Sequence, residues 1–98
     1  MQATTTRVEH NAQQVRNAYL DYMSRNGRPA TGEYMSTHDV ARHLKITLED
    51  LNQAVVHLVI NDPNFEVIPE SNQRALTADR RAWAVRVGNQ DRHLIGWY

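Results

Sequence analysis

The stretch from Ser36 to Val59 constrains the fold more than any other part of the chain. Ser36 and Thr47 each precede an acidic residue by three positions. At this spacing the hydroxyl caps a helix N-terminus, and the acid lies near the positive end of the helix dipole. Apolar residues follow each cap at helical spacing. They are Val40, Ala41 and Leu44 after the first cap, then Leu51, Ala54, Val55 and Leu58 after the second. The stretch therefore predicts two short amphipathic helices that pack against each other across a tight turn.

These residues resemble a helix-turn-helix. That family usually has a small residue where the second helix crosses the first, and Ala41 stands at this place, with Leu44 before the turn and Ile46 within it. The turn has Lys45 where the family often has glycine, the residue that adopts positive φ most easily. This departure leaves the turn geometry open. A plain helical hairpin is the alternative interpretation.

One helix is expected before this pair. It begins at a capping box formed by Thr6 and Glu9 and ends at Asn26-Gly27, where glycine suits the C-cap. Its apolar stripe is wide enough for two contacts. Either both contacts lie within the domain, or one of them is made with a second copy of the chain. A short strand is expected at residues 33–35, and the second helix of the pair ends before Pro63.

After Pro63 the apolar period changes from helical to alternating, which predicts strands. The first strand begins at Phe65, and the residues from Thr77 to Arg81 fit a single helical turn. A hairpin then joins residues 83–87 to residues 93–97. The large apolar residues of its two arms share a face only if the loop is odd in length, so we predict the three-residue loop 89–91. In this register Arg86 and Arg92 lie together on the solvent face.

Three helices followed by a hairpin resemble the winged helix-turn-helix fold over residues 6–97. The expected class is therefore α+β, in one domain of residues 1–98. Residues 1–5 are expected to be frayed, residues 36–59 form the helix-turn-helix, and residues 65–97 form a small antiparallel sheet with a C-terminal β-hairpin wing. In that family the second helix of the pair, here residues 47–60, enters the major groove, and the wing contacts the DNA backbone or the minor groove.

The resemblance implies a sequence-specific, DNA-binding transcriptional regulator. Asn52 and Gln53 carry the donor and acceptor pair that reads adenine, and Thr47 can contact a phosphate or a thymine methyl. Basic side chains beside the helix pair and in the wing are the expected phosphate contacts. They are Arg42, Lys45, Arg80, Arg81, Arg86 and Arg92. The alternative is a solvated surface on which the arginines neutralise the protein's own acids.

The charge balance keeps a second function class open. The chain has 11 basic and 11 acidic residues, whereas affinity for DNA comes largely from phosphate contacts. Glu49 and Asp50 also lie on the expected readout helix, where phosphates would repel them. The second class is a winged-helix module that binds another protein and little DNA. A DNA regulator of this kind is expected to form a homodimer, through the first helix and the C-terminal Trp97-Tyr98, because one neutral module offers few phosphate contacts.

Other function classes find no support in the sequence. There is no cysteine, and the five histidines are scattered, with no motif typical of a hydrolase, a metalloprotease or a phosphate-binding loop. We therefore expect no enzyme activity, no metal and no cofactor. No apolar run approaches the length needed to span a membrane, and a cytoplasmic location is expected.

Overall fold

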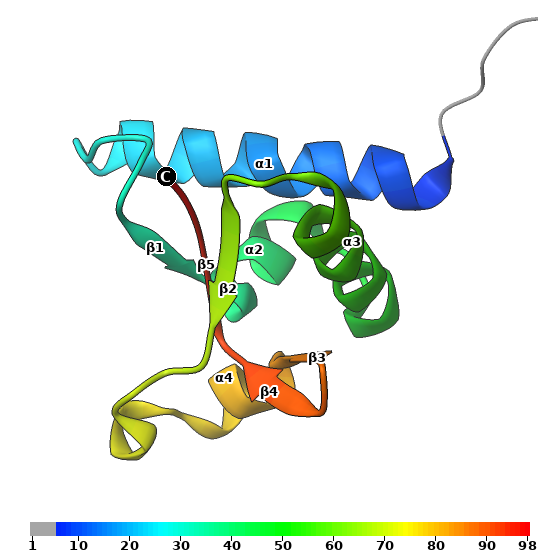
Figure 1. The fold of residues 1–98 in the computed structure, drawn as a ribbon. Coiled ribbons are helices and arrows are strands. Elements are labelled where there is room, and N and C mark those ends of the chain that lie inside the picture. The colour runs from blue at the N-terminus through cyan, green and yellow to red at the C-terminus, as the bar shows by residue number, and fades with distance from the viewer. Residues whose placement is uncertain (1–5) are drawn as a thin grey trace, which may run out of the picture.

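The computed structural model describes residues 6–98 and shows an α+β fold (Figure 1). The prediction of a frayed segment at 1–5 lies outside the described residues. The helices are α1 (Arg7–Arg25), α2 (Thr37–Leu44), α3 (Leu48–Asn61) and α4 (Ala78–Ala82), with a 3₁₀ turn at Gln73–Ala75. The strands are β1 (Tyr34–Ser36), β2 (Phe65–Ile68), β3 (Val85–Val87), β4 (Gln90–Arg92) and β5 (Leu94–Trp97). α1 runs along one side of the molecule, and α4 and the β3–β4 hairpin lie at the opposite end.

The predicted helix caps are confirmed. The side-chain oxygens of Ser36 and Thr47 each accept a hydrogen bond, at 3.1 Å, from the backbone N–H three residues later. Thr6 caps α1 in the same way by accepting from the Glu9 N–H. Between α2 and α3, Lys45 itself adopts the left-handed conformation at φ 54°, and its N–H donates to the Ala41 carbonyl. A non-glycine residue thus makes the turn that the family often gives to glycine.

The C-terminus of α1 and most of its apolar stripe make contacts within the chain, while Leu20 stays exposed. Gly27 has φ +63°, and the Arg28 N–H donates to the Met23 carbonyl at 2.9 Å, as in a Schellman motif. α1 packs against both α2 and α3, so the stripe makes two contacts within the domain. Its inward residues are fully or nearly fully buried. They are Ala12, Val15, Ala18, Tyr19 and Met23.

A three-stranded antiparallel sheet packs against the helices in the order β1-β5-β2. The C-terminal strand β5 is central, and Ile95 lies between Met35 and Val67 on the side that faces the core. Trp97 is the largest side chain of this strand. Its ring centroid lies 4.9 Å from that of Tyr19 and 4.8 Å from that of Phe65. The core therefore joins α1 directly to the last strand of the chain.

Trp97 is also fixed by polar groups. Its indole Nε1–H donates to Asp62 at 2.9 Å, just after the C-terminus of α3. This hydrogen bond is the main reason that the pKa of Asp62 is lowered. The Arg16 guanidinium lies over the indole ring at 5.2 Å from its centroid, a cation–π arrangement.

The outer face of the sheet has one position where only glycine fits. Tyr34 and Glu66 flank Gly96 on the neighbouring strands, and the Tyr34 hydroxyl donates to the Glu66 carboxylate at 3.1 Å. This hydrogen bond raises the pKa of the Tyr34 phenol. A Cβ on residue 96 would lie 2.7 Å from the Glu33 carbonyl oxygen and 3.0 Å from the Tyr34 ring. Because the Tyr19 hydroxyl already holds that carbonyl, the backbone cannot easily move away.

The predicted hairpin is wrong in its loop, its register and its second arm. The loop is the two-residue turn Gly88-Asn89, and Val85 pairs with Arg92, Arg86 with Asp91 and Val87 with Gln90. Gly88 and Asn89 both have positive φ, at 57° and 67°, which is the geometry of a two-residue hairpin turn. The chain then leaves this hairpin at His93 and enters the other sheet as β5. Ile95 and Trp97 are therefore buried through the pairing of β5 with β1 and β2. Their burial does not require the β3–β4 loop to have an odd number of residues.

Candidate functional site

The α2–α3 turn brings together three of the predicted DNA contacts. Thr47 caps α3, and its hydroxyl oxygen accepts from the Asp50 N–H. Lys45 in the turn and Arg42 in the last turn of α2 are exposed. Neither forms an ion pair with any residue in the range 6–98. Lys45 is therefore available to a ligand beside the N-terminus of α3, whereas Arg42 lines a separate hollow with Tyr22, Met35 and Asp39.

Asn52 has a role that the sequence did not indicate. Its side-chain oxygen accepts from the Arg86 backbone N–H at 2.6 Å, and its amide nitrogen donates to the Arg86 carbonyl at 3.2 Å. Both halves of the carboxamide are thus used to attach β3 to α3. To read adenine, Asn52 would have to give up this pair of bonds. These hydrogen bonds add to the packing of the buried Val85 of β3 in the core that α3 also forms.

The outward face of α3 is apolar and acidic. No lysine or arginine occurs between Leu48 and Asn61, and Glu49 and Gln53 are exposed. Aliphatic side chains are exposed along the same helix, with relative exposures of 39% at Leu48, 42% at Val59 and 74% at Ile60. Single exposed aliphatic residues are ordinary, but a group on one helix is a candidate contact surface.

Asp50, one of two acids in the first turn of α3, is already paired with a cation of the same chain. Arg7, in the first turn of α1, forms an ion pair of 2.6 Å with Asp50. Glu49 has no such partner among the described residues. The ion pair also connects the N-terminal ends of α1 and α3.

The hairpin arginines do not lie together as predicted. Arg86 is exposed and pairs with Asp91 at 3.1 Å, because these residues face each other across the hairpin. Arg92 lies opposite Val85 instead, on the inner side, and its Nη1 donates to the Val67 carbonyl at 2.8 Å. The shared solvent face of Arg86 and Arg92 is therefore corrected: the two-residue turn shifts the register by an odd number of positions, which turns Arg92 inward.

The two arginines of α4 differ in their surroundings. Arg81 donates to the Gln73 carbonyl at 2.6 Å and so closes the loop before α4. Arg80 is exposed and lines a small cavity together with Thr37, Glu70 and His93. Arg80 lies beside Thr37 and His38 at the N-terminus of α2, whereas the α2–α3 turn follows the C-terminus of that helix. The predicted phosphate contacts are thus divided between separate regions of the surface.

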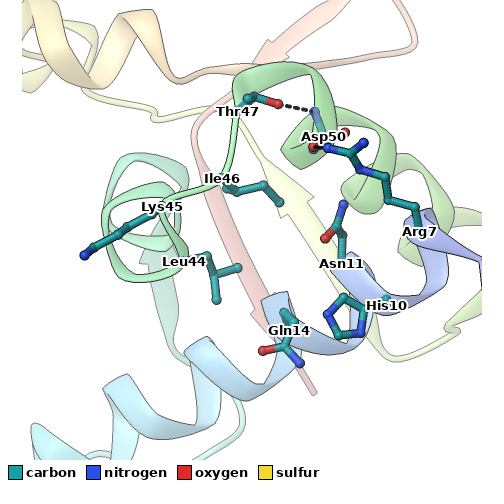
Figure 2. A pocket seen from close by; sticks show the side chains of 9 residues that line it. All are labelled: Arg7, His10, Asn11, Gln14, Leu44, Lys45, Ile46, Thr47 and Asp50. Atoms are coloured by element: carbon teal, nitrogen blue, oxygen red, sulfur yellow. Dashed lines mark hydrogen bonds and ion pairs between the residues drawn. The ribbon is translucent and has the colours of Figure 1, made fainter.

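A groove runs between the N-terminal half of α1 and the α2–α3 turn (Figure 2). Its volume is about 390 Å³, and nine residues line it. They are Arg7, His10, Asn11, Gln14, Leu44, Lys45, Ile46, Thr47 and Asp50. Leu44 and Ile46 lie on one side, facing Asn11 and Gln14 of α1 on the other. The groove thus combines an apolar wall with an amide wall, and the Arg7–Asp50 ion pair lies at one end.

The amide wall of the groove is unsatisfied within the protein. Asn11 and Gln14 are half-buried residues, and no hydrogen bond joins either carboxamide to another group in residues 6–98. Gln13, the neighbour of Gln14, instead donates to Asn17 along the helix surface. The sequence analysis missed this groove, because the polar residues at 10, 11 and 14 look like the solvent face of α1. Only the position of the turn shows that they are opposed by Leu44 and Ile46.

Two further properties limit the chemistry of the described region. Within residues 6–98, no three His, Asp or Glu side chains gather so as to hold a metal ion. Across the same residues, no helix combines the length and apolar character that crossing a membrane requires.

Comparisons of the chain with protein-family models, with curated proteins and with solved structures find no match.

Proposed function

We propose that the chain is a winged-helix module that binds another protein. The winged-helix assignment is supported by the element order, which is helix, strand, helix pair, strand, hairpin excursion and returning strand. It is also supported by the strand order β1-β5-β2, in which the returning strand lies between the first two. In this assignment α3 is the recognition helix, and the excursion from residue 69 to residue 93 serves as the wing.

A protein partner is favoured because several residues expected to contact DNA instead form bonds within the protein. Asn52 holds the backbone of Arg86, Arg86 pairs with Asp91, and Arg92 bonds to a strand carbonyl. What α3 offers to a partner is Glu49, Gln53 and three exposed aliphatic side chains. Apolar surface suits a protein partner, whereas a duplex requires cations aligned with its phosphates.

DNA binding remains the second candidate, because of one specific feature. Arg42 in the last turn of α2 and Lys45 in the turn before α3 are exposed, and the exposed Gln53 of α3 makes no side-chain hydrogen bond within residues 6–98. In a regulator these two cations would contact the phosphates, and Gln53 would read a base. Two such contacts give weak binding, so a regulator would need a homodimer. That dimer stays a prediction, for which Leu20 and Tyr98 supply exposed apolar surface.

A titration against duplex DNA of random sequence, followed by fluorescence anisotropy, separates the two functions. We expect no saturable binding at the low-salt end of a series from about 50 to 200 mM salt, a range over which phosphate-mediated affinity falls steeply. A regulator would instead bind at low salt, and the double variant Arg42→Gln, Lys45→Gln would lower its log–log salt slope by about two. Such a result would overturn the proposal.

Site-specific photo-crosslinking tests directly whether α3 contacts another protein. A photoreactive residue at Gln53 should give a discrete protein adduct in the source cells, and the same group at Arg25, at the far end of α1, should not. A nucleic-acid adduct at Gln53 would favour the regulator. Equal adducts at both positions would show that Gln53 does not lie at a specific interface.

A further inference from the structure

We infer that the groove between α1 and the α2–α3 turn holds a short acidic peptide segment of a partner protein, with one aliphatic side chain against Leu44 and Ile46. This inference rests on the proposed function, because it names the class of segment that the module would bind. It concerns a different surface from the outward face of α3. The two can therefore fail separately.

The unsatisfied carboxamides indicate a peptide as the occupant. Asn11 and Gln14 are one helical turn apart at the groove, and each offers a donor and an acceptor that no described residue takes up. An extended peptide presents alternating N–H and C=O groups along its length, which complement such a pair of amides. A polar group that is half-buried gains more from such a partner than one in open solvent.

The apolar wall accounts for the aliphatic anchor. Leu44 and Ile46 are half-buried and pack against the edge of the core. Figure 2 shows both side chains directed toward α1 across the groove. A volume of about 390 Å³ accommodates one aliphatic side chain with its flanking peptide units.

The charges around the groove favour an acidic segment. Asp50 is the one acid among the lining residues, and Arg7 already neutralises it. Lys45 lies on the turn beside the groove, its side chain directed away from Leu44 and Ile46 and without an ion-pair partner in residues 6–98 (Figure 2). The N-terminus of the 14-residue helix α3 opens beside it at Thr47, so its positive dipole end adds to the same preference. Glu49 does not line the groove.

The test is an NMR titration of the isotope-labelled protein with two pools of short acetylated peptide amides. One pool has aspartate or glutamate around an aliphatic residue, and the other has lysine at the same positions. We expect the acidic pool to bind at least about tenfold more tightly, a difference of about 1.4 kcal/mol. Its shifts should centre on the side-chain amide signals of Asn11 and Gln14.

Matched variants connect the binding to named residues. Lys45→Glu should lower the affinity for the acidic pool about tenfold and bring it to that of the lysine pool. Gln14→Ala should weaken both pools, whereas Gln13→Ala, at the next position on the same helix, should change neither. Equal binding of the two pools, shifts centred elsewhere, or an unchanged affinity in Lys45→Glu would overturn the inference.

The outcomes also separate this inference from the proposed function. If neither pool binds and duplex DNA also does not bind, the groove is not a peptide site, and the interaction module stands with α3 as its surface. If duplex DNA binds with a steep salt dependence, the proposed function falls. The peptide titration then shows by itself whether the groove binds an acidic peptide.

Discussion

Replacing Asn52 with alanine gives opposite results for the two roles of this side chain. In the structure, its carboxamide makes two hydrogen bonds to the Arg86 backbone, at 2.6 and 3.2 Å. Each is worth about 1 kcal/mol net at a partly exposed site. Alanine is the better helix former by about 0.6 kcal/mol, which offsets part of the loss. The variant should therefore be destabilised by about 1–1.5 kcal/mol.

If Asn52 were instead free to read bases, only the propensity term would remain. Asn52→Ala would then be more stable than the parent by about 0.6 kcal/mol. The sign of the change in unfolding free energy thus decides between a docking residue and a base reader. Urea denaturation followed by circular dichroism measures this quantity. For a domain of this size, 1 kcal/mol corresponds to about 4–8 °C in Tm.

Hydrogen exchange locates the effect. The Arg86 amide proton should exchange faster in Asn52→Ala, because it has lost its acceptor, while amides in the middle of α1 should change only with global stability. Gln53→Ala is the matched control: it lies on the same helix, is exposed, and should stay within about 0.5 kcal/mol of the parent. Unchanged or increased stability in Asn52→Ala, with unchanged exchange at Arg86, would refute the docking role.

Three further predictions concern the core, the sheet and pH. Leu51→Asp should abolish the cooperative thermal transition, because Leu51 is fully buried and an unpaired charge there costs several kcal/mol, by a rough estimate; a normal melt would contradict the helix packing. Gly96→Ala should lower the unfolding free energy by about 1–3 kcal/mol through overpacking, and a neutral effect in urea denaturation would argue against the close approach of the Glu33 carbonyl. Because the folded-state pKa of Asp62 is lowered, its stabilising contribution is present above the unfolded value and is lost as the pH falls through the folded value. The stability difference between the parent and Asp62→Asn should therefore shrink below about pH 4, and a pH-independent difference would exclude this linkage.

The sequence alone determined the features that depend on a few neighbouring residues. Ser36 and Thr47 cap helices because the hydroxyl and the amide that it accepts from are three residues apart, so no distant contact is needed. Gly27 ends α1 because positive φ costs glycine little. The single turn after Thr77 was likewise predicted and is α4. Such signals fix where helices begin and end, and the helical spacing of the apolar residues then fixes which faces are buried.

Tertiary structure decided the features that depend on which segments meet. The alternation of residues 83–87 and 93–97 predicts that the two segments pair with each other, but β5 pairs with β1 and β2. Ile95 and Trp97 are therefore buried whatever the length of the β3–β4 loop. The two-residue turn of the β3–β4 hairpin turns Arg92 inward, and the docking of β3 on α3 uses the Asn52 carboxamide. Alternation along a strand shows which residues share a face, but the partner strand decides what covers that face, and this pairing is set by contacts far apart in the sequence.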